Sequence, residues 1–254
     1  MKIHDKVCVV TGAAGGIGEA VARAFVTAGA RGVAIADLDA PRLAAVARDI
    51  GALAVACDIA REDEVQRLIR ETQARFGPVD VFFSNAGIAR PGHAAASDLD
   101  WADSWAIHVM SHVYAARALI PDMLARGTGY LLNTASAAGL LASMSSAPYA
   151  VTKHAAVALA EHLSIHYADQ GIKISVLCPQ AVDTNMYRGI GTTAAGLDGI
   201  MTPAAVAEIV LQAIDEERFL ILTHPVVQDY VNRKASNLAR WLAGMRRLRA
   251  RTVK

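Results

Sequence analysis

Three side chains in the middle of the chain have the types and the spacing for proton exchange with an alcohol. Tyr149 and Lys153 are four residues apart, so on a helix they share one face. An ammonium group beside a phenol favours the phenolate and lowers the tyrosine pKa from its usual value of about 10. Tyr149 would then exchange a proton with a hydroxyl or carbonyl oxygen. Ser136, thirteen residues before the tyrosine, would hydrogen-bond and orient the same oxygen.

A glycine-rich segment near the N-terminus suits a dinucleotide. The segment Thr11-Gly12-Ala13-Ala14-Gly15-Gly16-Ile17-Gly18 follows an apolar run and precedes an amphipathic stretch. Glycines let the backbone turn tightly and approach a pyrophosphate, and the helix N-terminus offers free N–H groups to the anion. The position between a strand and a helix favours a cofactor loop over a plain tight turn.

In this order and at this separation, the motifs resemble those of the short-chain dehydrogenase/reductase family, from about Lys6 to about Met186. The resemblance implies that a nicotinamide cofactor carries the hydride, that Tyr149 is the acid/base and that Lys153 also holds the nicotinamide ribose. The cofactor residues that it implies are Gly12, Gly16, Ile17, Gly18, Asp37, Leu38, Asp58, Ile59, Asn85, Ala86, Gly87, Tyr149, Lys153, Pro179, Val182 and Thr184.

Asp37 sets the expected choice of cofactor. It ends the second apolar run, where a carboxylate can accept hydrogen bonds from both hydroxyls of the adenosine ribose. Its charge would repel a 2′-phosphate, and neither Leu38 nor Asp39 can neutralise one. We therefore expect NAD rather than NADP. The alternative for Asp37 is a helix N-cap or a turn residue.

Two segments resemble further motifs of the family. Asp58 corresponds to an adenine-contacting Asp, with a backbone or apolar contact from Ile59. Asn85-Ala86-Gly87 resembles a motif that stabilises the sheet beside the adenosine ribose. Ser84 replaces the first Asn of that motif, so a structural role and a cofactor contact both stay open for it.

The segment from Pro179 to Thr184 resembles the family's Pro-Gly-x-Val-x-Thr, which contacts the nicotinamide carboxamide in relatives. Val182 would reach the carboxamide through its backbone, and Thr184 would use its hydroxyl or contact a phosphate. Gln180 stands where the family has Gly, which leaves the loop geometry and the pocket polarity open.

A second departure concerns the family's catalytic Asn, which shapes a helix irregularity and binds a water that relays protons to the lysine. Counting forward from Trp101 and backward from Pro121 both lead to His108. A neutral His can also donate and accept a hydrogen bond, but its ring is larger and titrates near pH 6.5. His108 either replaces the Asn in catalysis, or is a structural or interface residue, or marks an impaired site. Because the other three residues are intact, we expect an active enzyme.

The hydrophobic pattern predicts the fold class. Short apolar runs without polar alternation suggest strands buried on both faces of a parallel sheet, and their alternation with amphipathic stretches selects a Rossmann-type, doubly wound α/β fold of about seven strands. We expect one domain over residues 1–254. The predicted strands are Val7–Val10, Gly32–Ala36, Ala52–Cys57, Val81–Phe83, Tyr130–Asn133, Lys173–Cys178 and Phe219–Leu222. The predicted helices are Ile17–Ala28, Pro41–Ile50, Glu62–Phe76, Trp101–Arg126, Tyr149–Asp169 and Pro203–Glu216.

Composition excludes several classes of function. The formal net charge of +1 argues against a general nucleic-acid binder, and no apolar run approaches eighteen residues, so we expect no membrane span. The N-terminus is too polar for a signal peptide. The three cysteines lack metal-binding spacing and favour a reduced, cytoplasmic compartment. No metal is expected, and His93, His112, His154, His162 and His166 are expected at the surface or at an interface.

The expected substrate is a hydrophobic secondary alcohol or ketone. In the family, substrate contacts come from the loops after the fifth and sixth strands, which here include a substrate loop over residues 186–202. These loops carry Gly139, Leu140, Leu141, Met144, Met186, Tyr187 and Ile190, although the same stripe could be ordinary packing. The alternatives are a polyol, sugar or acyl-thioester dehydrogenase, and an impaired NAD-binding sensor or scaffold.

Relatives imply a homo-oligomer, a tetramer or a dimer, that pairs the helices predicted over Trp101–Arg126 and Tyr149–Asp169. Small residues at Ala155, Ala156, Ala158 and Ala160 would allow these helices to approach closely. The basic, amphipathic tail over residues 235–254 is expected to form a helix on the body or on a neighbouring subunit. A membrane-surface or nucleic-acid role for the tail has weaker support.

Overall fold

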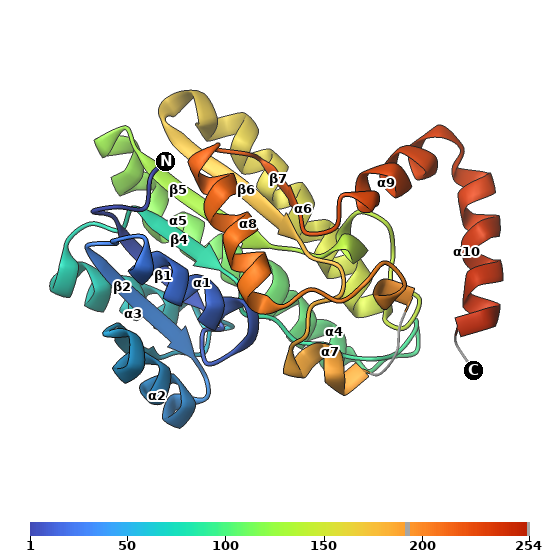
Figure 1. The fold of residues 1–254 in the computed structure, drawn as a ribbon, viewed down its shortest axis with the longest axis horizontal. Coiled ribbons are helices and arrows are strands. Elements are labelled where there is room, and N and C mark those ends of the chain that lie inside the picture. Colours follow the sequence, from blue (N-terminus) through green and yellow to red (C-terminus); the bar gives the residue numbers. More distant parts are fainter. Residues whose placement is uncertain (191–193, 253–254) are drawn as a thin grey trace.

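A parallel sheet of seven strands forms the centre of the protein (Figure 1). The computed structural model describes residues 1–190 and 194–252. The strands pair in the order β3-β2-β1-β4-β5-β6-β7, and every pair is parallel. Their bounds are β1 Val7–Thr11, β2 Gly32–Asp37, β3 Leu53–Ala56, β4 Val81–Ser84, β5 Gly129–Thr134, β6 Ile172–Cys178 and β7 Leu220–Leu222. All seven predicted strands are confirmed, each end within one residue.

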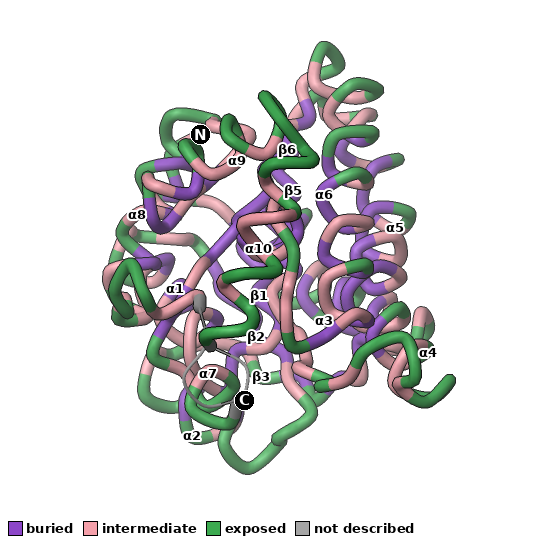
Figure 2. The backbone as a smooth tube through the Cα atoms, turned by 90° about the vertical axis from the view of Figure 1, so that its right-hand side faces the viewer, coloured by how far each residue is buried: buried purple, intermediate pink, exposed green. Residues whose placement is uncertain are grey.

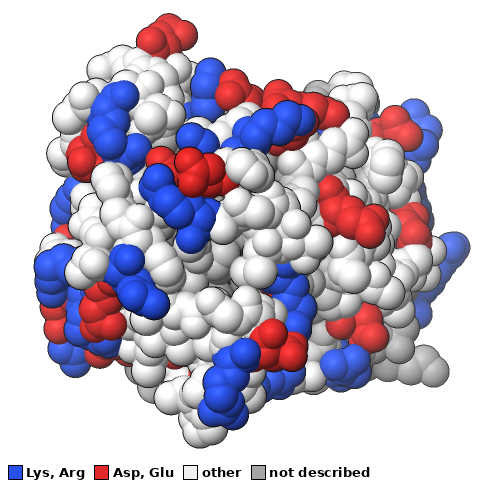
Figure 3. Space-filling view, turned by 60° about the vertical axis from the view of Figure 1, so that its left-hand side comes forward, with Lys and Arg blue, Asp and Glu red and all other residues white. Residues whose placement is uncertain are grey.

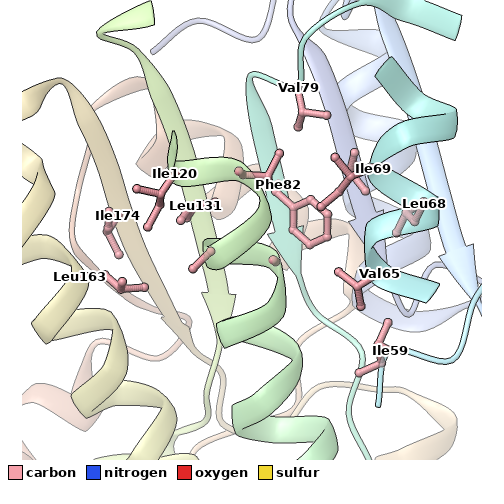
Figure 4. Close-up of a cluster of buried hydrophobic side chains, with 14 of the residues drawn as sticks. Ile59, Val65, Leu68, Ile69, Val79, Phe82, Ile120, Leu131, Leu163 and Ile174 are labelled. Carbon is pink, nitrogen blue, oxygen red and sulfur yellow. The ribbon is translucent and has the colours of Figure 1, made fainter. Parts of the chain in front are cut away.

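Helices cover both faces of the sheet, which makes this the doubly wound fold that the pattern predicted. The helices α1 (Gly16–Thr27), α2 (Ala40–Ile50) and α8 (Pro203–Asp215) pack on one face, and α3 (Glu62–Phe76), α5 (Ser111–Arg126) and α6 (Ala147–Tyr167) pack on the other. Successive strand residues enter opposite cores, so Val9 faces the second set of helices and Val10 the first. Figure 4 shows Phe82 and Leu131 beneath the helices of the second set.

The helix predicted over Trp101–Arg126 consists of three segments. The helix α4 (Asp98–Trp105) is followed by a π-helical segment, Ala106–Met110, and then by α5. The helix α4 begins three residues early because Ser97 Oγ accepts a hydrogen bond from the Asp100 N–H at 3.1 Å. The Ser-x-x-Asp pattern in the sequence could have revealed this start. The extra residue of a π turn changes which side chains face α6.

The C-terminal region forms two helices, of which the sequence predicted only the second. The helix α9 (Val226–Ser236) is joined to α10 (Leu238–Thr252), and α10 packs against α9. Figure 1 shows α10 set apart from the sheet, and Figure 2 shows that it lies in front of the sheet's edge. Within the predicted substrate loop, the structure has α7 (Asn185–Ile190) and a short 3-10 turn, Ala194–Gly196. Residues 191–193 of that loop lie outside the described part.

Charged side chains of both signs lie on the surface (Figure 3), and the three thiols are buried. Figure 3 shows basic and acidic side chains interspersed over one face, in keeping with the formal net charge of +1. Among the helices of the described residues, none is long and apolar enough to cross a bilayer. Cys8, Cys57 and Cys178 are buried and free.

Candidate active site

One cavity of about 2120 Å³ brings most of the predicted site residues together. It lies at the carboxyl ends of the strands, where the order of strands reverses between β1 and β4. Two predicted residues, Gly18 and His108, do not line it. The predicted residues that do are Gly12, Gly16, Ile17, Asp37, Leu38, Asp58, Ile59, Asn85, Ala86, Gly87, Ser136, Tyr149, Lys153, Pro179, Val182 and Thr184.

The glycine loop has the form of a pyrophosphate cradle. Gly12 has a φ of 66°, and a Cβ there would lie 2.7 Å from the Ala86 Cα. A Cβ at Gly18 would lie 2.2 Å from the Gly12 carbonyl oxygen, so Gly18 permits α1 to pack against the loop without reaching the cavity itself. No side chain caps the N-terminus of α1. Its first N–H groups therefore lack a side-chain partner and suit an anion.

The adenosine end of the cavity carries both an acidic and a basic side chain. The Asp37 carboxylate accepts hydrogen bonds from the N–H groups of Ala14 and Asp39, each at 3.1 Å. Arg42, on α2, also lines the cavity, and its guanidinium lies 2.9 Å from where a Gly15 Cβ would stand. Arg42 was not predicted, because only Leu38 and Asp39 were considered as neighbours of a 2′-phosphate. Its place in the first turn of the next helix was the available signal.

The start of α6 sets the positions of the tyrosine and the lysine. Ser146 caps the helix, and its Oγ accepts a hydrogen bond from the Tyr149 N–H at 3.0 Å. Tyr149 therefore lies in the first turn, and Lys153 follows one turn later. The Lys153 Nζ donates to the Thr134 carbonyl at 2.8 Å and lies 5.7 Å from the centre of the Tyr149 ring.

Ser136 completes the group of three side chains. Contrary to the prediction, the protein alone does not lower the pKa of Tyr149. Burial raises the pKa of Tyr149 above its usual value, while a hydrogen bond from Ser136 acts in the opposite direction. Burial also lowers the pKa of Lys153 to about 7, so its ammonium charge is itself disfavoured. The positive charge of a bound nicotinamide ring would also favour the phenolate, and the burial of Lys153 does not weaken that effect.

His108 is a buried residue whose ring is fully hydrogen-bonded. Its Nε2 accepts from the Ile88 N–H at 3.1 Å, and its Nδ1 lies 2.8 Å from the Thr152 Oγ1. Thr152 donates its own proton to the Pro148 carbonyl, so the Nδ1 of His108 is the donor in that pair. Burial lowers the pKa of His108 to about 2, which keeps the ring neutral. Among the three interpretations of this position, the structure favours a structural histidine, and the π-helical irregularity is kept around it.

His112 is not at the surface, so the prediction for it was wrong. It is 2% exposed, and neither ring nitrogen has a hydrogen-bond partner among the described residues. Burial is the first cause that lowers its pKa to about 3. The helical periodicity that places His112 one turn after His108 could have indicated this. The other four histidines are exposed or half-buried, and the described residues contain no cluster of His, Cys, Asp or Glu that could hold a metal ion.

Asn85 has a structural role in the sheet. Its Nδ2 donates to the Thr11 carbonyl at 3.1 Å, and its Oδ1 accepts from the Thr134 hydroxyl at 3.2 Å. These bonds join the ends of three strands beneath the cavity. Ser84 is buried and does not line the cavity, so the structural interpretation holds for it.

Gln180 connects the end of β6 to the C-terminal region. Its Nε2 donates to Asp198 Oδ2 at 2.7 Å, and the Tyr230 hydroxyl donates to Asp198 Oδ1 at 3.0 Å. All three side chains line the cavity. The sequence marked Gln180 as a departure from the family, but nothing in the sequence indicated Asp198 or Tyr230 as its partners.

The substrate end of the cavity is only partly as predicted. Leu141, Met144, Met186 and Tyr187 line it, whereas Gly139 and Leu140 do not. A Cβ at Gly139 would lie 2.5 Å from the Lys153 carbonyl oxygen, and Leu140 packs against the core. The side chain of Ile190 lies outside the described part of the structure. Further apolar lining that the sequence did not predict comes from Leu197, Trp241, Met245 and Leu248.

The predicted alanine surface on α6 is also partly wrong. Ala156 and Ala160 are fully buried in the core of the same chain, because they lie on the face of α6 that packs on the sheet. Ala158 is exposed. The large apolar side chains that α6 does expose are Val151 and Ile165.

This arrangement of fold and site is that of the short-chain dehydrogenases. The chain belongs to this family, whose sequence pattern matches residues 6–195. The family consists of oxidoreductases that use nicotinamide cofactors. A relative from Streptomyces exfoliatus, 1-deoxy-11-beta-hydroxypentalenate dehydrogenase, is 34% identical over 234 residues, which cover 88% of this chain and 85% of the relative.

Solved structures extend the similarity to the fold. A short chain dehydrogenase/reductase from Burkholderia phymatum, in complex with NAD, has a TM-score of 0.85 at 30% identity, over 94% of this chain and 96% of its own. L-sorbose reductase from Gluconobacter frateurii, complexed with NADPH and L-sorbose, has a TM-score of 0.78 at 25% identity, over 87% of this chain and 97% of its own.

Proposed function

We propose that the protein is an NAD-dependent oxidoreductase that transfers a hydride between NAD(H) and the carbinol carbon of a hydrophobic secondary alcohol or its ketone. The observation that carries the proposal is the meeting of Ser136, Tyr149 and Lys153 in the cavity that also contains the glycine loop and Asp37.

Each of the three side chains has a role that its contacts support. The bound nicotinamide supplies or accepts the hydride. During oxidation the Tyr149 phenolate oxygen takes the proton from the alcohol hydroxyl, and during reduction the phenol returns a proton to the carbonyl oxygen. Ser136 hydrogen-bonds that oxygen and orients it. Lys153, which donates to the Thr134 carbonyl and lies beside the tyrosine, would hold the ribose.

The proposed cofactor is a dinucleotide. The glycine loop and Asp37, both at the carboxyl ends of the strands, support it. The Asp37 carboxylate favours NAD because it would repel a 2′-phosphate, while Arg42 would attract one. We propose NAD because Asp37 ends β2 itself. One solved relative is in complex with NAD and the other with NADPH, so the preference for NAD over NADP is tested separately below.

The substrate end favours a lipophilic compound. Leucine, methionine and tryptophan side chains line this part of the cavity beside polar residues such as Asn237 and Arg240, and the apolar part would exclude water from the reacting carbon. The relative named for a hydroxypentalenate supports an alcohol of this kind. A sugar or polyol, as in the L-sorbose reductase, is the alternative within the family.

The test is to follow reduced nicotinamide by absorbance with NAD and NADP over a panel of aliphatic, aryl, cyclic and polyhydroxy alcohols. We expect turnover with NAD and the highest kcat/KM for lipophilic secondary alcohols. Tyr149→Phe should reduce kcat by at least about a thousandfold while cofactor binding persists. Near-normal turnover in Tyr149→Phe would disprove the mechanism, and NAD binding without turnover on any alcohol would favour a sensor.

We also propose a homo-oligomer in a reducing compartment such as the cytoplasm. The exposed Val151 and Ile165 on α6 provide apolar surface for a subunit contact, and three buried free thiols suit reducing conditions. Light scattering of the purified protein would give the oligomeric state.

A further inference from the structure

We infer that Gln180 binds the carboxamide of the nicotinamide ring, with its side-chain Oε1 accepting a hydrogen bond from the carboxamide N–H₂. The inference rests on the proposed function, because it needs a nicotinamide cofactor in the cavity. Gln180 would thereby be a specificity-determining residue for the cofactor's reactive end.

The contacts of Gln180 fix the orientation of its amide. The amide nitrogen donates to the Asp198 carboxylate at 2.7 Å. Turning the amide over would set its carbonyl oxygen against a carboxylate oxygen, and two acceptors repel each other. The Tyr230 hydroxyl holds the other oxygen of Asp198 at 3.0 Å, so the carboxylate cannot turn away without losing that bond.

The fixed Oε1 is an acceptor that lacks a donor. It is buried, and it has no hydrogen-bond partner among the described residues. A buried carbonyl oxygen without a partner is costly, since it has lost its water and gained nothing in exchange. A donor from a bound molecule would satisfy it.

The position of Gln180 places that donor at the proton-transfer end of the cavity. The Gln180 N–H donates to the Thr223 hydroxyl at 3.1 Å, and the preceding carbonyl of Pro179 accepts from the Ala137 N–H at 2.8 Å. Ala137 directly follows Ser136. The backbone of Gln180 is thus attached to the turn that carries the substrate-orienting serine, and Gln180 and Ser136 line the same cavity.

Two considerations favour the carboxamide over a second hydroxyl of the substrate. The carboxamide offers two N–H donors in every catalytic cycle, whichever alcohol is bound, and a rigidly held acceptor suits a constant ligand. The substrate class that we propose has one hydroxyl to offer, and that hydroxyl would face Ser136 and Tyr149.

Binding measurements with a cofactor analogue test the inference without relying on turnover. In the reduced form of 3-acetylpyridine adenine dinucleotide, an acetyl group replaces the carboxamide and carries no N–H donor. Calorimetry would give Kd for NADH and for this analogue with the wild-type protein, Gln180→Leu and Gln180→Met. We expect the preference for NADH over the analogue to fall by about five- to tenfold in both variants, the effect of one lost hydrogen bond.

Gln212 offers a matched control. Its Nε2 also donates to a carboxylate, that of Glu216 at 2.8 Å, but it lies on α8 and does not line the cavity. Gln212→Leu should keep the wild-type preference for NADH. Asp198→Asn, which removes the reason for one amide orientation, should lose part of the preference.

The outcomes separate this inference from the function on which it rests. If the wild-type protein binds neither dinucleotide, the proposed function fails. If it binds both and Gln180→Leu and Gln180→Met keep the wild-type preference, the assignment of Gln180 fails while the proposed reaction stands. If the variants instead change only the preference between alcohols with one and two hydroxyls, Oε1 binds substrate and the carboxamide assignment is likewise overturned.

Discussion

The Nδ1 of His108 donates to the Thr152 hydroxyl at 2.8 Å, and the Thr152 hydroxyl donates to the Pro148 carbonyl at 2.7 Å. This chain of hydrogen bonds joins the π-helical segment to the first turn of α6, which carries Tyr149. The rings of His108 and Tyr149 also meet edge to face, with centres 5.4 Å apart. These contacts support the interpretation that His108 positions the tyrosine, and we propose that it does not exchange protons at neutral pH.

Replacing His108 should affect stability more than pH dependence. His108→Ala leaves the Ile88 N–H and the Thr152 hydroxyl short of a partner and opens a cavity, so we expect a loss of about 2–4 kcal/mol in the free energy of unfolding. His108→Asn, which keeps a donor and an acceptor, should lose less and retain turnover. Urea denaturation and kcat would be measured for both, with the exposed His166→Ala as control. Equal stability of His108→Ala and wild type would contradict the hydrogen bonds.

His112 should make the protein labile in acid. Its folded pKa of about 3 lies below the usual value of about 6.5, so between these pH values the unfolded chain binds a proton that the folded chain does not. Stability is therefore lost as pH falls through this window. His112→Leu removes the effect and two unpartnered nitrogens. The variant's advantage in urea denaturation should grow from pH 7.5 to pH 5, and an advantage independent of pH would count against the assignment.

Lys153 should have an effect of the same sign as His112, but in a window at higher pH. Its folded pKa of about 7 lies below the usual value of about 10.4, so in between the unfolded chain is protonated and the folded chain is not. Stability should rise with pH from about 7 to about 10. Lys153→Met removes this slope, whereas the exposed Lys2→Met should keep it. Parallel denaturation profiles for wild type and Lys153→Met would show that the lysine is not desolvated as described.

Asp37 and Arg42 should act in opposite directions on cofactor choice. Asp37→Ser removes the charge that repels a 2′-phosphate, so the ratio of kcat/KM for NAD over NADP should fall roughly 10- to 100-fold. Adding Arg42→Ala should return part of the ratio, because the nearby cation is then lost. Asp49→Ser, an exposed acid outside the cavity, serves as control. An unchanged ratio in Asp37→Ser would show that another residue governs the choice.

The sequence predicted the sheet well because each strand is a short apolar run whose ends are set by local residues. It predicted Tyr149 and Lys153 because a spacing of four residues places both on one face of a helix, whereas Ser136 followed from the resemblance to the short-chain dehydrogenase/reductase family. It missed Arg42, the burial of His112 and the partners of Gln180. These features depend on which face of a helix meets the sheet and on contacts between segments far apart in the chain. One example is the link from Gln180 through Asp198 to Tyr230.

The separation of α10 from the sheet has a consequence for how this enzyme can diverge. The helix lines the cavity with Trp241, Met245 and Leu248, yet it is attached to the body through α9 and contributes nothing to either core of the sheet. Mutations in the last turns of the chain can therefore be neutral for folding and still alter which compounds enter. We therefore expect that the substrate range of this protein can change in α10 without a matching change in the stability of the fold.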